Sequence, residues 1–129
     1  MNGEYLVQQA EAAYQTQDLE QILSLFDPEI VVYWNGQKIV QGIEELRRLH
    51  EKWGIRKDFK IKKTLRAVMG DTIAVEWHSS WIDENGKLNE GYGGEFWIMS
   101  HNRLKEWHAY YTRYISGNLA TASGQPKDS

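Results

Sequence analysis

The chain has 129 residues, a net charge of −3 and no cysteine. Its length is that of one domain, and its acidic balance gives no general attraction to nucleic acid. The missing cysteines exclude disulfides, a thiol nucleophile and a zinc–cysteine site. With no signal peptide and no long apolar run, the sequence predicts a cytoplasmic protein that does not enter a membrane.

The first half of the chain has helical periodicity, interrupted by one short hairpin. Helices are expected over 4–16, 17–26 and 43–53. Asp18 is the expected N-cap of the second helix, and Asp27–Pro28 ends it. The β-branched and aromatic run over 29–34 predicts a strand, which turns at 35–38 and pairs back at 39–40.

After Gly54 the apolar period changes from helical spacing to two. Four long strands are expected, over 58–69, 72–82, 90–98 and 104–115. Helices followed by strands indicate one α+β domain over 1–116, with three N-terminal helices packed on a strongly curved antiparallel sheet. The small polar residues over 117–129 predict a disordered tail.

Aromatic side chains are numerous, with six tryptophans and seven tyrosines. Rings in that number either fill a wide core or line an apolar pocket that has a few polar groups. Basic residues crowd the region between Arg47 and Arg66, which is either a solvated face or the site of an anionic ligand or partner.

Short motifs carry a resemblance to a known superfamily. "AEAAYQTQD", "QGIEEL", "GDTIAV" and "YGGEFW" follow one another between residues 10 and 99. They resemble the nuclear-transport-factor-two-like superfamily, and most closely a SnoaL-like family whose function is not established. The superfamily includes ketosteroid isomerases, limonene epoxide hydrolases and polyketide cyclases. The resemblance implies a cone-shaped α+β barrel with an internal cavity, in a fold that hosts many chemistries.

Strand alternation places Lys63 and Glu95 on the cavity side of the sheet, as its only ionisable pair. One interpretation is a buried structural ion pair. The other makes Glu95 a general acid or base and Lys63 its partner, or an anchor for an anionic substrate. Alternation gives the first strand two registers, with either Val32 and Trp34 or Tyr33 and Asn35 pointing inward.

The candidates for ligand contact come from the inward face of the sheet and from the helices. They are Tyr14, Tyr33, Trp34, Asn35, Trp53, Trp77, Ser79, Trp81, Trp97, Trp107 and Tyr111.

The resemblance also tests individual chemistries. The positions that match the catalytic residues of limonene epoxide hydrolases are Trp77, Ser79 and Ala109, none of which activates water. SnoaL-type cyclases also use an acid at the position of Ala109. Ketosteroid isomerases have their base near Trp34, where this chain has none, whereas Glu95 falls close to their oxyanion-binding acid.

The four histidines are interpreted as structural, and no metal site is predicted because no carboxylates join them at ligand spacing. The opposite face of the sheet mixes Glu76, His78, Phe96, Ile98 and Tyr110, which is too apolar for a wet surface. Such a patch usually marks an interface, and outer sheet faces in the superfamily often form homodimers, so we expect a homodimer.

These observations leave three interpretations of the function. The first is an isomerase, lyase or cyclase without a cofactor, acting on a small hydrophobic or aromatic molecule by general acid–base chemistry. The second is a module that binds such a ligand without catalysis. The third is a dimerisation domain whose tryptophans fill the cone. A void of several hundred Å³ favours the first two.

Overall fold

The computed structural model describes residues 1–116, so the tail predicted over 117–129 lies outside the described residues. The elements are α1 (Gly3–Thr16), α2 (Leu19–Leu23), β1 (Phe26–Trp34), β2 (Gln37–Gln41), α3 (Ile43–Trp53), β3 (Lys57–Met69), β4 (Thr72–Ile82), β5 (Leu88–Ser100) and β6 (Arg103–Ile115). None of the described helices is long and apolar enough to cross a membrane.

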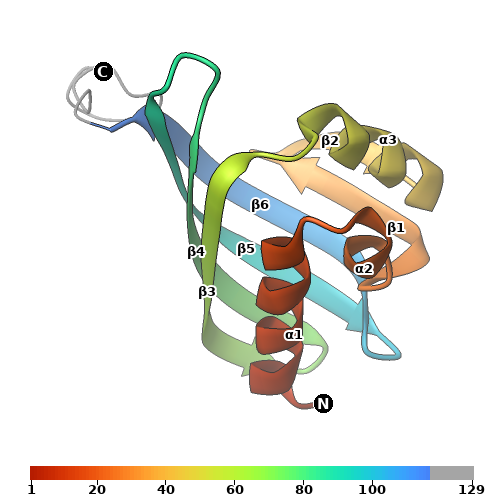
Figure 1. Ribbon diagram of the computed structural model, residues 1–129. Helices are drawn as coiled ribbons and strands as arrows, with labels where there is room; N and C mark the ends of the chain where they lie inside the picture. The colour runs from red at the N-terminus through yellow and green to blue at the C-terminus, as the bar shows by residue number, and fades with distance from the viewer. Residues whose placement is uncertain (117–129) are drawn as a thin grey trace.

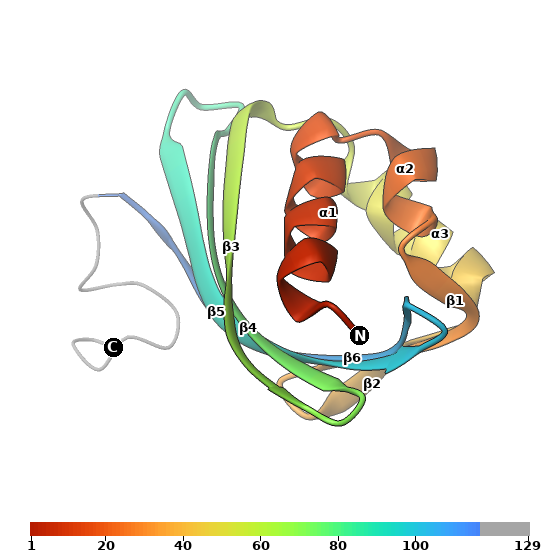
Figure 2. The ribbon, with the colours of Figure 1, turned by 90° about the horizontal axis from the view of Figure 1, so that it is seen from below.

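The six strands form one sheet in the order β2-β1-β6-β5-β4-β3. The sheet bends strongly, and the three helices lie on its concave side (Figures 1 and 2). The predicted cone-shaped α+β fold is therefore confirmed. The sheet is mixed, because β1 runs parallel to β6 while the other neighbouring strands are antiparallel, and its edges β2 and β3 do not close into a full barrel.

The second helix is shorter than predicted. Asp18 caps α2 as expected, since its Oδ1 accepts a hydrogen bond of 3.1 Å from the Gln21 N–H. However, α2 ends at Leu23, and Phe26 begins β1, where it pairs with Leu104 and is 3% exposed. Helical periodicity assigned Phe26 to the helix because an apolar residue at that spacing fits either a helix or a buried strand end.

The apolar core lies between the helices and one end of the concave sheet face. Its most deeply buried side chains are Val7, Ile30, Val32, Leu46, Ile73, Val75 and Trp97. Cross-strand pairing places Ile73, Trp97, Trp107 and Val32 side by side in one row. The neighbouring rows of residues cover the rest of the concave face. The alternation of the long strands places the polar candidates in those rows.

Two glycines of β5 make room for the indole of Trp77 on the neighbouring strand. A Cβ built on Gly93 would lie 2.8 Å from the Trp77 indole nitrogen and 2.6 Å from the Tyr110 backbone oxygen. A Cβ on Gly91 would lie 3.1 Å from the same indole. A glycine inside a strand marks a bend or a close approach, and here it marks the close approach of Trp77.

We expect Gly93→Ala to lower the free energy of unfolding by about 1–3 kcal/mol, because the added methyl group overpacks against Trp77 and the backbone of β6. Gly94→Ala is the matched control, since a Cβ there has only ordinary contact, at 3.9 Å from the Val75 oxygen. Urea denaturation of both variants measures the difference. Equal stability of the two variants would contradict this packing.

Candidate functional site

A cavity of about 540 Å³ lies between the concave sheet face and the three helices. Its aromatic walls are Tyr14, Trp34, Trp53, Phe59, Trp77, Trp81, Trp107 and Tyr111. This volume is in the usual range of ligand pockets. The tryptophans therefore line the cone and do not fill it.

The first strand adopts the register in which Val32 and Trp34 point inward. Tyr33 lies on the opposite face, where its ring stacks on His108 at 4.6 Å between centroids. Asn35 lies in the turn, and its Oδ1 accepts a hydrogen bond of 3.2 Å from the Tyr111 backbone N–H. The pairing of β1 is irregular against β2 between Val32 and Tyr33, and against β6 between Phe26 and Val31. From Val31 to Trp34 the pairing with β6 is regular, so the alternation is preserved there.

This register corrects the expectation that Tyr33 and Asn35 line the cavity. Trp97 was also expected to line the cavity, but its side chain packs in the apolar core and does not reach the cavity surface. Ser79, from β4, lines the cavity and is buried.

The aromatic walls brace one another. The Trp34 ring stacks on Trp53 at 5.7 Å with an interplanar angle of 9°, and meets the Tyr111 ring edge-on at 5.6 Å. Tyr111 in turn contacts Trp77 at 6.3 Å. These rings come from β1, α3, β6 and β4, so the walls join the sheet to the helical side. Aromatic pairs of this geometry stabilise beyond their buried area, which favours a cavity that is formed before any ligand binds.

Lys63 and Glu95 meet inside the cavity. The Lys63 Nζ lies 3.5 Å from the Glu95 Oε1, and the two side chains are only 4% and 3% exposed. They come from β3 and β5, on either side of β4, with Lys63 opposite Trp77 and Glu95 opposite Val75. A lysine is long enough to reach across the intervening strand, so the period-two pattern brings the two charges together.

The Glu95 carboxylate is held through one oxygen. The Trp97 indole N–H donates a hydrogen bond of 2.7 Å to Oε1, the atom that also faces Lys63. Within residues 1–116, no hydrogen bond or ion pair engages Oε2. Because Glu95 lines the cavity, its second oxygen is left to accept from a bound molecule.

A second polar pair, which sequence reasoning missed, joins Tyr14 and His50. The Tyr14 hydroxyl lies 2.8 Å from the His50 Nε2, and the His50 Nδ1 lies 3.0 Å from the Leu46 carbonyl oxygen. A carbonyl only accepts, so Nδ1 carries the hydrogen and Nε2 accepts from the tyrosine. The stripe of Leu46, His50 and Trp53 along α3 is the signal that could have placed His50 in the cavity.

Burial keeps this second pair neutral. It lowers the pKa of His50, and the positive charge of Arg56 lowers that pKa further, although the hydrogen bond to Leu46 opposes the shift. Burial also raises the pKa of Tyr14 well above its usual range, with help from the negative charge of Glu95. At neutral pH the cavity therefore has a phenol, an imidazole and one ion pair on its inner surface.

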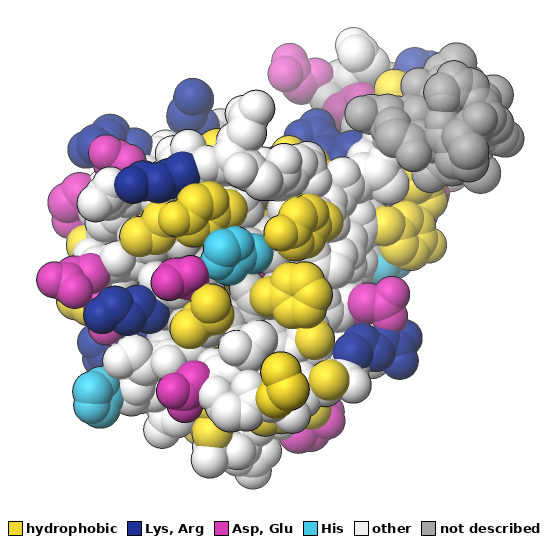
Figure 3. All heavy atoms as spheres, turned by 180° about the vertical axis from the view of Figure 1, so that it is seen from behind, with side chains coloured by type: hydrophobic (Ala, Val, Ile, Leu, Met, Phe, Trp, Pro, Cys, Tyr) yellow, Lys and Arg dark blue, Asp and Glu magenta, His cyan; other side chains and the backbone are white. Residues whose placement is uncertain are grey.

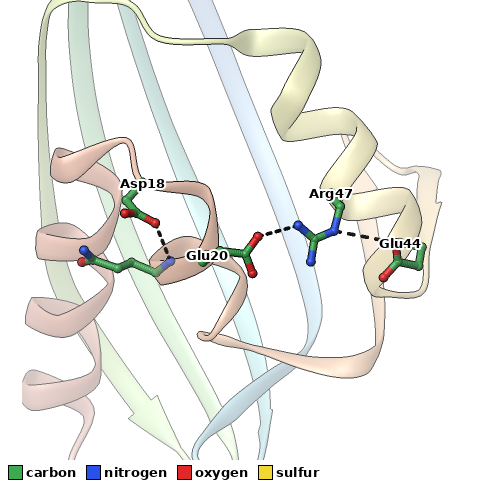
Figure 4. Close-up of polar contacts among 5 residues, drawn as sticks. Asp18, Glu20, Glu44 and Arg47 are labelled. Carbon is green, nitrogen blue, oxygen red and sulfur yellow. Dashed lines mark hydrogen bonds and ion pairs between the residues drawn. The ribbon is translucent and has the colours of Figure 1, made fainter.

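The helical side of the cavity is fixed by surface ion pairs. Arg47 of α3 pairs with Glu20 of α2 at 2.6 Å and with Glu44 at 3.7 Å (Figure 4). Figure 4 also shows Asp18 at the start of α2, where its carboxylate accepts from the helix backbone. Asp18 and Glu20 both line the cavity. Their charges are engaged by these contacts with the α2 backbone and with Arg47.

Within residues 1–116, no three histidine or carboxylate side chains gather as metal ligands would.

The chain matches, over residues 2–121, the family described as "Protein of unknown function (DUF1348)". This protein belongs to that family. No curated protein matches the sequence.

Many solved structures share the fold, and NTF2-like proteins are among them. A candidate polyketide cyclase from Xanthomonas campestris pv. campestris has a TM-score of 0.71 at 16% identity, with 84% of this chain and 88% of that chain covered. A candidate isomerase from Bacillus subtilis has a TM-score of 0.71 at 14% identity, with 86% and 89% covered. TerC, co-crystallised with polyporic acid, has a TM-score of 0.68 at 14% identity, with 83% and 88% covered. The resemblance to the nuclear-transport-factor-two-like superfamily is confirmed, and identities this low show the fold alone.

We expect Lys63→Met to lower the free energy of unfolding by about 3–5 kcal/mol, because it leaves the Glu95 carboxylate buried without its counter-charge. The neighbouring Lys62→Met is the matched control. Lys62 is 74% exposed and 3.9 Å from Glu11, so its loss should cost less than about 1 kcal/mol. Urea denaturation compares the two, and similar small losses would contradict this prediction, because the substitution would then not leave Glu95 as an uncompensated buried charge.

Proposed function

We propose that the protein is a cofactor-independent enzyme that moves a proton on a small hydrophobic or aromatic molecule bound in the cavity. The observation that carries the proposal is the Glu95 carboxylate, which Lys63 and Trp97 hold through Oε1 while Oε2 has no described protein partner. A general base must have a free lone pair within reach of the proton that it removes. The reaction class is that of an isomerase, a lyase or a cyclase.

In this mechanism the Glu95 Oε2 takes a proton from a carbon next to a carbonyl group of the ligand. The electron pair of the C–H bond moves into the new C=C bond, and the negative charge develops on the carbonyl oxygen. The Lys63 ammonium, whose side chain is buried, has further N–H donors for that oxygen. Glu95 then returns the proton to another carbon, or the enolate expels a leaving group or closes a ring.

Other features of the cavity support this chemistry. The aromatic walls provide the apolar surface that a hydrophobic ligand requires. Tyr14 stays protonated beside the ion pair because its pKa is raised, so it is available as a neutral hydrogen-bonding group and not as a second base. The candidate cyclase and isomerase of the same fold agree with the reaction class.

The test is solvent deuterium exchange into a panel of aromatic and terpenoid ketones, such as 1-tetralone, 2-tetralone and carvone, followed by proton NMR. We expect the wild-type protein to accelerate exchange at an acidic C–H bond of at least one ketone. Glu95→Gln should lose about 100-fold or more of that acceleration, the usual worth of a positioned base. Glu90→Gln, on the same strand but paired with His78 on the outer face, is the control and should retain it.

Binding without catalysis is the second candidate function, because the same cavity would serve it. In that case ketones or related ligands raise the melting temperature, yet no ketone in the panel exchanges its protons. Such a result would contradict the proposed base and leave Lys63 and Glu95 as a neutralised pair in a ligand pocket.

We further propose that two copies associate through the outer sheet face. Figure 3 shows hydrophobic side chains among charged ones over this face. Tyr92, Phe96 and Tyr110 are 46–48% exposed there, and aromatic side chains are enriched in interfaces. Sedimentation equilibrium should give a dimer for the wild-type protein and a monomer for Phe96→Lys. A monomeric wild type would contradict the proposal.

A further inference from the structure

Two arginines lie at the open end of the cavity, far from Glu95. The Arg56 Cζ is 4.1 Å from the centre of the Trp81 ring and 5.6 Å from that of Trp53. The Arg113 Cζ is 5.4 Å from the same Trp81 ring. Both arginines line the cavity, as does Ile55, which is 80% exposed and marks the mouth. The mouth is therefore a tryptophan with two guanidinium groups packed against it.

Arg56 is held in place by an amide from another element. Gln17, at the end of α1, accepts a hydrogen bond of 2.7 Å from the Arg56 backbone N–H through Oε1, and its Nε2 donates one of 3.0 Å to the Arg56 carbonyl. Both backbone groups of Arg56 are thus fixed by one side chain. The guanidinium lies over the Trp81 ring, which restricts its position, and its N–H donors form a fixed planar fork. The group is preorganised for a planar anion.

Within the described part of the chain, neither guanidinium has a carboxylate as its counter-charge. Among residues 1–116, no carboxylate forms an ion pair with Arg56 or Arg113. The carboxylates of the cavity lining are engaged elsewhere: Glu95 by Lys63, Asp18 by the α2 backbone, and Glu20 by Arg47. The remaining one, Glu51, lies near the positive charge of Arg47. The hydrogen bond to Glu20 raises the pKa of Arg47 most, and the negative charge of Glu51 adds to that shift.

The two arginines also act on each other. Burial lowers the pKa of Arg56, and the positive charge of Arg113 lowers it further. Arg56 is partly buried and Arg113 is exposed, and two like charges beside one tryptophan ring are unfavourable unless an anion joins them. An anion bound between them would relieve the repulsion and accept charge-assisted hydrogen bonds, which are the strong ones.

We infer that the mouth binds the carboxylate of the ligand, so that the molecule taken up by the cavity is a hydrophobic carboxylic acid. This inference rests on the proposed function, because it assigns the substrate class of the same cavity. Arginine forks match carboxylates with two parallel hydrogen bonds. The aromatic walls between the mouth and Glu95 hold the apolar body of the acid.

The sheet register gives the length of that body. Glu95 lies opposite Ala109 and Gly91 lies opposite Arg113, so the two ends of the site are four residues apart on β6. That separation is about 13 Å of strand. The ligand is therefore an elongated acid whose carboxylate is at the mouth and whose reactive carbon, at the far end, reaches Glu95.

The test is a pair of fluorescent probes that share one ring system and differ in charge, 1-pyrenebutyrate and 1-pyrenebutanol. Quenching of the emission of the cavity tryptophans by the bound pyrene gives the dissociation constant of each probe with the wild-type protein. The variants are Arg56→Gln, Arg113→Gln and the double substitution. Arg48→Gln, which removes an exposed arginine of α3 outside the cavity, is the control with the same change of charge. Melting temperatures show that each variant is folded.

We expect the wild type to bind the acid at least about tenfold more tightly than the alcohol, which is the worth of one charge-assisted hydrogen bond. Each single substitution should reduce this preference, the double substitution should abolish it, and Arg48→Gln should keep it. Affinity for the alcohol should not change in any variant, because it reports on the aromatic cavity alone.

Equal affinity of the wild type for acid and alcohol would overturn the inference while leaving the proposed ligand cavity in place. A preference that survives in the double variant, or that Arg48→Gln also loses, would equally overturn it, because the charge would then act from elsewhere. If neither probe binds, the cavity does not take up elongated hydrophobic molecules, and both the inference and the proposed function fail. If the double variant is unfolded, Arg113→Gln decides, since Arg113 is an exposed residue.

Discussion

The burial of Lys63 and Glu95 inside an aromatic cavity is the constraint on which the rest of the site depends. Removing two charges from water costs several kcal/mol for each ion, and their mutual attraction offsets this only in good geometry. Here the contact of 3.5 Å between Lys63 and Glu95, and the hydrogen bond that the Trp97 indole N–H donates to the carboxylate, offset part of this desolvation cost. An apolar pair would fill the same space without that cost, which favours a functional reason for the charges.

The fold serves this constraint in two ways. The strong bend of the sheet, which Figure 2 shows wrapping around α1, separates the concave rows from the helices and leaves space between them. The glycines of β5 let Trp77 lie close to the sheet, so its indole forms a wall without filling the cavity. The same concave face thus changes from packed core around Trp97 to open cavity around Glu95. Beyond it, the arginines of the mouth give the cavity a positively charged outer end, so the mouth and the Glu95 end of the site differ in their chemistry.

Much of this arrangement follows from the sequence. Period-two alternation over four long strands fixes which residues share a face, so the meeting of Lys63 and Glu95 was predictable. The register of the first strand was not, because a bulge and a clean alternation fit its residues equally well. The parallel direction of β1 was also hidden, since β6, its neighbour, is distant in the sequence. His50 and the arginine pair depend on how α3 and residues 54–56 lie over the sheet. Tertiary packing decides that placement. The stripe along α3 indicates that His50 shares a face with Leu46 and Trp53, but it does not indicate which part of the sheet that face covers.

We propose that the Lys63–Glu95 pair is present for the ligand and not for stability. The most direct measurement replaces both residues at once with apolar residues of similar size, as Lys63→Met with Glu95→Leu, and compares unfolding free energy and ligand-induced thermal shift with the wild type. We expect the double variant to be at least as stable as the wild type, because replacing a buried ion pair by well-packed apolar groups is often neutral or stabilising. We also expect it to lose the response to the ketones or acids that stabilise the wild type. A double variant that is several kcal/mol less stable and keeps its full ligand response would show that the pair is structural and contradict the claim.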